Sequence, residues 1–153
     1  MNERIWIYTL SKELSNEQLV DFNNRCLNFV SGWTAHDVSL DASFELYQNR
    51  LLIFKVNEDK YNASGCSIDK LQRFIQSQEK EFDSELLNRF LVALDVKDSI
   101  MVVHSSKIKE LLSTNVIDEN TPVYDATITS SVDMKDLKKA LKSTWLCKYL
   151  PSL

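Results

Sequence analysis

Strand-like and helix-like segments alternate along this chain in an order that few folds allow. Apolar residues at helical spacing predict helices, and β-branched or aromatic runs predict strands. In order, the segments are a strand at 4–10, a helix from Ser15, strands at 43–47 and 51–56, a helix at 67–82 and a strand at 90–96. This is the βαββαβ order of ferredoxin-like split βαβ sandwiches. We therefore predict an α+β protein with a ferredoxin-like core.

Further segments follow this core and are expected to extend it. They are a strand at 99–104 that should pair with 90–96 around Lys97-Asp98, a short helix capped by Ser105, a strand at 122–129 and a helix at 132–142. No Gly-, Pro- or Ser-rich linker interrupts the sequence. We therefore expect one domain over residues 1–153, with a C-terminal strand-helix-strand-helix extension.

The first predicted helix has the clearest boundary in the chain. Ser15 and Gln18 have the spacing of a capping box, in which each side chain accepts the backbone N–H of the other residue. Cys26 belongs to the apolar stripe of this helix, and Gly32 offers a left-handed residue that can end it. We expect the helix to begin at Ser15 and to bury Cys26.

The arrangement of the predicted sheet follows from the strand patterns and from chirality. The strand at 4–10 has no mainly charged face, so we expect it mid-sheet. The strands at 43–47 and 51–56 should form a hairpin beside it, joined by a tight turn. Because right-handed connections place both crossovers of a split βαβ unit on one side, both helices should cover the same face.

Length and composition limit the class of protein. The 153 residues include 44% hydrophobic and 26% charged residues, as expected for one soluble globular domain. The longest apolar runs are strand-sized, and no signal-peptide pattern follows the N-terminus. Three cysteines without a close pair agree with a reducing compartment. We expect a cytoplasmic protein with no membrane partner.

Charge and ligand spacing argue against several partners. The net charge of −4 disfavours broad nucleic-acid binding, which needs a basic footprint. His36 and His104 have no His or Cys at metal-ligand spacing. We therefore expect no metal site, and no motif in the chain indicates a cofactor.

The stretch from Asn62 to Asp69 has an unusual composition. Gly65 precedes Cys66 and Ser67, as in a tight turn that delivers a cysteine to a helix capped by Ser67. The helix dipole favours a thiolate there, whereas burial and the carboxylate of Asp69 oppose it. We interpret Cys66 as a buried structural cysteine that reacts slowly with thiol reagents.

A cysteine-dependent hydrolase or thiol enzyme is the alternative function. It would use Cys66 as the nucleophile and His36 as the base. Asp37 or Asp69 would orient the base, although no local signature marks this set. A cysteine phosphatase is excluded, because Gln72 occupies the position of the arginine that its phosphate-binding loop requires.

Trp33 and His36 follow the end of the first helix and allow two interpretations. Their rings could line a pocket or hold a partner peptide, because indole and imidazole combine apolar area with a polar tip. Alternatively, Trp33 closes the core below the helix and His36 bonds to the backbone. The sequence leaves both interpretations open.

The segment 132–142 combines helical spacing with clustered positive charge. Its lysines stand at i, i+3, i+4 and i+7: Lys135, Lys138, Lys139 and Lys142. A solvated helix face is the simplest interpretation. We also consider a contact surface for an acidic protein, in which Trp145 and Tyr149 would supply aromatic anchors.

Four short motifs stand out beside these patterns: Gly32-Trp33-Thr34-Ala35-His36, Ala42-Ser43, Ala63-Ser64-Gly65-Cys66-Ser67-Ile68-Asp69 and Ser143-Thr144-Trp145. With them the chain resembles a small family of uncharacterised bacterial proteins, some labelled "ABC transporter ATPase". A phosphate-binding loop ends in a Gly-Lys pair, whereas both glycines here precede other residues. The resemblance implies no established activity, and the sequence does not support an ATPase.

These observations favour a cytoplasmic protein-interaction module over an enzyme. The candidate binding residues are Trp33, His36, Ser64, Gly65, Cys66, Lys135, Lys138, Lys139, Lys142 and Trp145. The expected partner is an acidic protein that binds the C-terminal basic helix.

Overall fold

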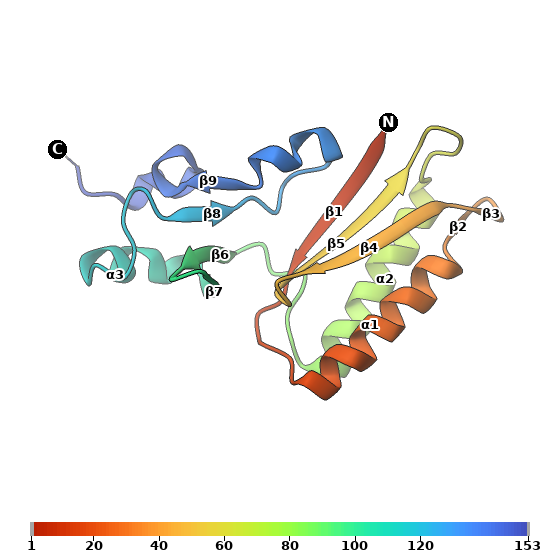
Figure 1. Ribbon diagram of the computed structural model, residues 1–153, viewed down its shortest axis with the longest axis horizontal. Coiled ribbons are helices and arrows are strands. Elements are labelled where there is room, and N and C mark those ends of the chain that lie inside the picture. The colour runs from red at the N-terminus through yellow and green to blue at the C-terminus, as the bar shows by residue number, and fades with distance from the viewer. Residues whose placement is uncertain (1, 153) are drawn as a thin grey trace.

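The computed structural model describes residues 2–152, in which two antiparallel sheets and a small hairpin accompany two long helices (Figure 1). The first half contains β1 (Glu3–Thr9), α1 (Asn16–Ser31), β2 (Thr34–Ala35), β3 (Val38–Ser39), β4 (Asp41–Tyr47), β5 (Leu51–Asn57) and α2 (Gly65–Phe82). The second half contains β6 (Leu91–Val96), β7 (Ser99–His104), α3 (Ile108–Ser113), β8 (Pro122–Tyr124) and β9 (Lys138–Ala140). The α+β class is therefore confirmed.

The first sheet has the strand order β1–β5–β4 and is antiparallel throughout. On one face, Leu52 and Phe54 of β5 pack with Phe22 of α1 and Leu71 of α2 in one core. The β4–β5 hairpin lies beside β1, and both helices cover the same face, as predicted (Figure 1). Each large apolar side chain buried in this core contributes about 1.5–3 kcal/mol.

The four-stranded sheet of a ferredoxin-like core is not confirmed. The prediction that the first strand lies mid-sheet is wrong, because β5 is the middle strand and β1 lies at the edge. β6 pairs with β7 and β8 in the second sheet, whose order is β7–β6–β8–β9. Among the described residues, the outer edge of β1 carries one short bridge, between Arg4 and Ser130.

The second sheet packs against the open face of the first. Ile5 and Ile53 share a core with Ala93, Tyr124 and Ile128, so the two halves of the chain bury one another's apolar side chains. The predicted hairpin around Lys97-Asp98 is present as β6 and β7. Both turn residues have left-handed φ angles, 52° and 62°, which match the right-handed twist of a two-residue hairpin.

The structure confirms the predicted start of α1 and corrects the predicted start of α2. Ser15 caps α1 in the predicted box with Gln18. α2 begins earlier than predicted, because Ser64 is its N-cap and Ser67 is the third helical residue that completes a second box. Gly32 has a φ angle of −108°, so the predicted left-handed end of α1 is wrong.

The predicted helix over 132–142 is wrong. A 3₁₀ turn, η2 (Ser131–Asp136), precedes β9, and another, η3 (Leu141–Ser143), follows it. β9 pairs with β8 through Val123 and Lys139. Leu137 and Leu141, which lie directly before and after β9, are buried. The apolar residues that suggested a helix are therefore core residues that flank a short edge strand.

Candidate functional site

Trp33 is a core residue. Its side chain is 1% exposed, and its indole N–H donates a 2.8 Å hydrogen bond to the Ser67 carbonyl of α2. Phe29 and Phe54 contact the indole ring with centroid separations of 5.2 and 6.3 Å. The interpretation of Trp33 as part of an open pocket is therefore wrong, because the ring fills the space between α2 and the first sheet.

His36 and Cys66 are both exposed to solvent. His36 lies in the two-residue turn between β2 and β3, with a left-handed φ of 51°. The expected burial of Cys66 is wrong: α2 begins at Gly65, so the thiol belongs to its first turn rather than to a packed turn before it. Within residues 2–152, no hydrogen bond joins Cys66 to His36 or to Asp69.

Ser64 and Gly65 have structural roles at the start of α2. Ser64 Oγ accepts the backbone N–H of Ser67, and Ser67 Oγ accepts that of Ser64. Gly65 has no positive φ, and a Cβ added there would meet nothing within 4 Å. The motif that resembles a bacterial family therefore forms a helix cap whose glycine needs no special backbone conformation.

The C-terminal lysines do not form one basic stripe. A hydrogen bond to Asp95 at 2.9 Å raises the pKa of Lys138. Lys139 forms a separate ion pair at 3.1 Å with Asp125. Neighbouring residues of a strand point to opposite faces, which explains the different partners. The remaining two lysines lie in the flanking 3₁₀ turns: Lys135 and Lys142.

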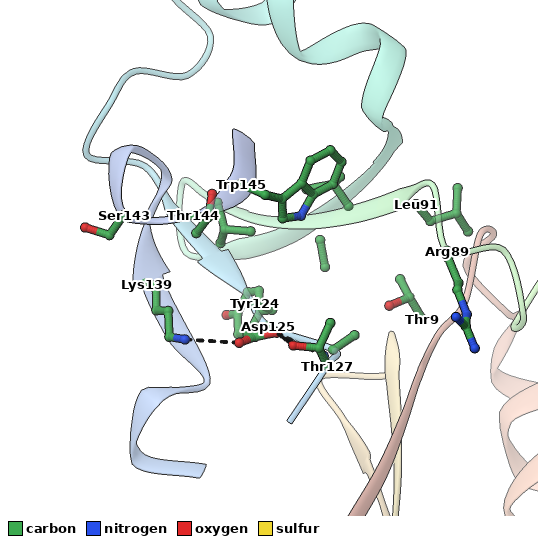
Figure 2. Close-up of a pocket in the computed structure, with 14 residues that line it drawn as sticks. Thr9, Arg89, Leu91, Tyr124, Asp125, Thr127, Lys139, Ser143, Thr144 and Trp145 are labelled. Atoms are coloured by element: carbon green, nitrogen blue, oxygen red, sulfur yellow. Dashed lines mark hydrogen bonds and ion pairs between the residues drawn. The ribbon is translucent and has the colours of Figure 1, made fainter. Parts of the chain in front are cut away.

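Two adjoining cavities lie between β1 and the C-terminal half of the chain. The β1-edge groove, of about 530 Å³, is bounded by residues 5–9, 87–89 and 126–129. The Trp145 pocket, of about 290 Å³, is bounded by residues 124–127, Lys139 and 143–145 (Figure 2). The two cavities share five residues, Thr9, Arg89, Leu91, Ala126 and Thr127, so they adjoin one another.

The outer edge of β1 is bonded near its start, the chain is bonded again just after its end, and the stretch between is open. Ile5 N–H donates to Thr129 at 2.9 Å, and Ser11 N–H donates to Glu85 at 3.0 Å. Backbone groups alternate sides along a strand, so those of Ile7 and Thr9 face the same outer edge. Within residues 2–152, no backbone or side-chain hydrogen bond reaches Ile7 or Thr9 on this side. The groove follows this unpaired stretch.

Charged groups lie on both sides of the Trp145 pocket (Figure 2). Partial burial raises the pKa of Asp125, but hydrogen bonds from Thr127 and Lys139 outweigh it and hold that pKa below its ordinary value. Lys139 and Asp125 thus neutralise each other. Arg89, which lines both cavities, has no ion pair or side-chain hydrogen bond within the described residues.

Of the predicted binding residues, Lys139 and Trp145 line this site. Trp145 is 52% exposed, and the Lys148 ammonium lies 5.1 Å from its ring centroid. Sequence patterns did not indicate Thr9, Arg89 or Ala126. These residues meet through pairing between segments far apart in the chain, for which the sequence has no local signal.

Comparisons with protein-family models, curated proteins and solved structures find no match to this chain. Among the described residues, no group of three or more His, Cys, Asp or Glu side chains is arranged to hold a metal ion. None of the helices in residues 2–152 has both the length and the apolar character needed to cross a bilayer. The candidate site therefore rests on the geometry of the two adjoining cavities.

Proposed function

We propose that this protein is a non-enzymatic protein-interaction module whose ligand site consists of the β1-edge groove and the Trp145 pocket. The observation that carries the proposal is the position of the groove along a strand edge whose middle backbone groups have no partner within residues 2–152. Ligand sites are typically concave, and this surface is concave and combines apolar side chains with polar and charged groups.

We infer further that the first sheet is a ferredoxin-like sheet without its fourth strand. The order β1, α1, β4, β5, α2 and the position of β5 between β1 and β4 support this relation. In the complete fold a fourth strand would pair with β1, which is where the groove lies. A cytoplasmic location is also proposed, since all three cysteines are free thiols.

The thiol-enzyme alternative has less support. Its nucleophile and base, Cys66 and His36, are not joined by a hydrogen bond, and neither residue lines the two cavities. A general base works at hydrogen-bond distance from the group that it deprotonates. Binding at the groove is therefore the function that the geometry favours.

A peptide selection tests the proposed site. Random heptapeptides displayed on phage would be selected on the wild-type protein and tested on two variants. Ala126→Trp fills the junction of the two cavities, whereas Asn120→Trp adds the same side chain at an exposed residue that lines neither. We expect enriched peptides to bind Ala126→Trp at least about tenfold more weakly and Asn120→Trp unchanged. Equal binding to both variants, or no enrichment, would refute the proposal.

A further inference from the structure

We propose that the β1-edge groove binds an extended peptide segment as a fourth strand of the first sheet, with an acidic side chain of that segment facing Arg89. This inference rests on the proposed function and names the class of partner. The partner is a protein segment that pairs with β1 through its backbone, so its recognition depends on main-chain hydrogen bonds plus one charge.

The backbone of β1 supplies the first argument. Ile7 and Thr9 are only 9% and 7% exposed, yet their outward N–H and C=O groups have no partner in residues 2–152. Leaving such groups unpaired in a largely buried residue is costly, so a ligand or water must satisfy them. Two donors and two acceptors alternating along one edge match the backbone of another extended chain.

The length of the open edge limits the ligand. Ile5 and Ser11 are already bonded to Thr129 and Glu85, so the free stretch lies between them. At about 3.4 Å per residue, the distance from Ile5 to Ser11 is roughly 20 Å. A short segment of about four or five residues fits this stretch. The hydrogen bonds at both ends prevent pairing with a longer strand.

The charge of the groove supplies the second argument. Arg89 lines both cavities and has no ion pair among residues 2–152, whereas Lys139 is paired with Asp125. Figure 2 shows Arg89 near Thr9, on the side of the pocket opposite Lys139 and Asp125. A carboxylate beside Arg89 would gain an ion pair, while one placed beside Lys139 would meet the charged Asp125. The acidic residue of the ligand is therefore assigned to Arg89.

Three defined peptides test the inference. They are end-blocked heptapeptides of alternating Thr and Val that differ at one central position, which is Asp, Asn or Lys. We expect the Asp peptide to bind about two- to fivefold more tightly than the Asn peptide, and the Lys peptide to bind most weakly. Arg89→Gln should abolish the preference for Asp over Asn. Arg73→Gln, which removes an exposed arginine of α2 outside both cavities, should retain it.

N-methylated peptides and hydrogen exchange test the backbone pairing separately. N-methylation of the Asp peptide, one amide at a time, should weaken binding at alternate residues within its paired central stretch, because alternate amides of a strand face β1. Hydrogen exchange of the Ile7 and Thr9 amides, followed by NMR, should slow when the peptide binds. The amides of the peptide's paired central stretch that face β1 should be protected as well.

The outcomes separate this inference from the proposed function. Binding that Ala126→Trp weakens, but without the two-residue pattern or slower exchange at Ile7 and Thr9, would overturn strand addition and leave the groove as a ligand site. If none of the three peptides bound at millimolar concentration, strand addition would be wrong and water would satisfy the edge. The phage selection would then decide the proposed function alone. Equal effects of Arg89→Gln and Arg73→Gln would remove the acidic residue from the proposal.

Discussion

Single residues in this protein often have roles that their sequence motifs do not reveal. Gly65 lies in the most distinctive motif of the chain, yet it is an ordinary first residue of α2 without a positive φ. Trp33 belongs to another motif and is buried against α2. These residues serve helix capping and packing, so the motifs are explained by structure before any binding role is needed.

Gly65→Ala is expected to stabilise the protein by about 0.4–1 kcal/mol. An alanine reduces the conformational freedom of the unfolded chain, and its Cβ would meet no atom within 4 Å. Urea unfolding measures the change. Gly32→Ala is the companion variant: the nearest atom to its Cβ would be the Asn28 oxygen at 3.8 Å, so we expect no loss of stability. A loss of stability above about 1 kcal/mol for Gly32→Ala would indicate that Gly32 ends α1 in a left-handed conformation after all.

The buried thiol of Cys26 should make stability depend on alkaline pH. Burial raises the pKa of Cys26 from its ordinary value of 9.0 to about 12. Its contribution to stability is complete below about pH 9 and is lost as the pH rises toward 12, because the unfolded chain then releases a proton that the folded chain keeps. The free energy of unfolding should fall by up to about 1.4 kcal/mol per pH unit in this window.

Urea unfolding between pH 8 and 11 measures this slope, and Cys26→Ala is the control. The variant should be less stable at pH 8 because it leaves a cavity, but its stability should decline less steeply with pH. A decline remains expected, since burial also raises the pKa of Tyr8 from 10.0 to about 12. Parallel slopes for the two proteins would show that Cys26 does not titrate as its burial implies.

At the scale of elements, turn residues and strand runs in the sequence predict some strands, whereas others form only through pairing with a neighbouring strand. The β6–β7 hairpin follows from its sequence, because a strand-like run flanks a two-residue turn on each side. β9 does not, because the lysines and leucines of the segment 132–142 have helical spacing and only pairing with β8 makes residues 138–140 a strand. Short edge strands of this kind are stabilised by their neighbours rather than by their own sequence.

The turn of the β6–β7 hairpin offers a stabilising substitution. Lys97 and Asp98 both adopt left-handed φ angles, which Asn and Gly accept at lower cost. The double substitution Lys97→Asn with Asp98→Gly should raise the free energy of unfolding by about 1 kcal/mol and the melting temperature by several degrees. Calorimetry measures both. Lowered stability would mean that the native side chains have contacts that outweigh the backbone strain.

At the scale of the whole molecule, the shared core couples the two halves. Ile53 of β5 is fully buried among residues of both sheets. Ile53→Ala should therefore cost about 2–5 kcal/mol and destabilise the whole chain rather than one half. Because the halves share this core, circular dichroism and tryptophan fluorescence should give the same unfolding midpoint. The fluorescence reports on both halves, since Trp33 and Trp145 belong to different ones. Val132→Ala, at an exposed position, is the control. Two separate transitions would show independent halves.

The sequence alone determined the features that depend on neighbours along the chain. The capping box of α1 and the β4–β5 and β6–β7 hairpins follow from residue spacing and turn residues. These interactions join residues close in sequence, so a single chain displays their signals.

Only the tertiary structure decided where β6 pairs and, with it, where the candidate site lies. Pairing with β7 and β8 removes β6 from the edge of β1 and leaves Ile7 and Thr9 open beside Arg89. Strand-like sequence does not specify a pairing partner, because side-chain alternation is compatible with several neighbours. The choice depends on how all apolar faces are buried together, and that balance is set by the complete fold.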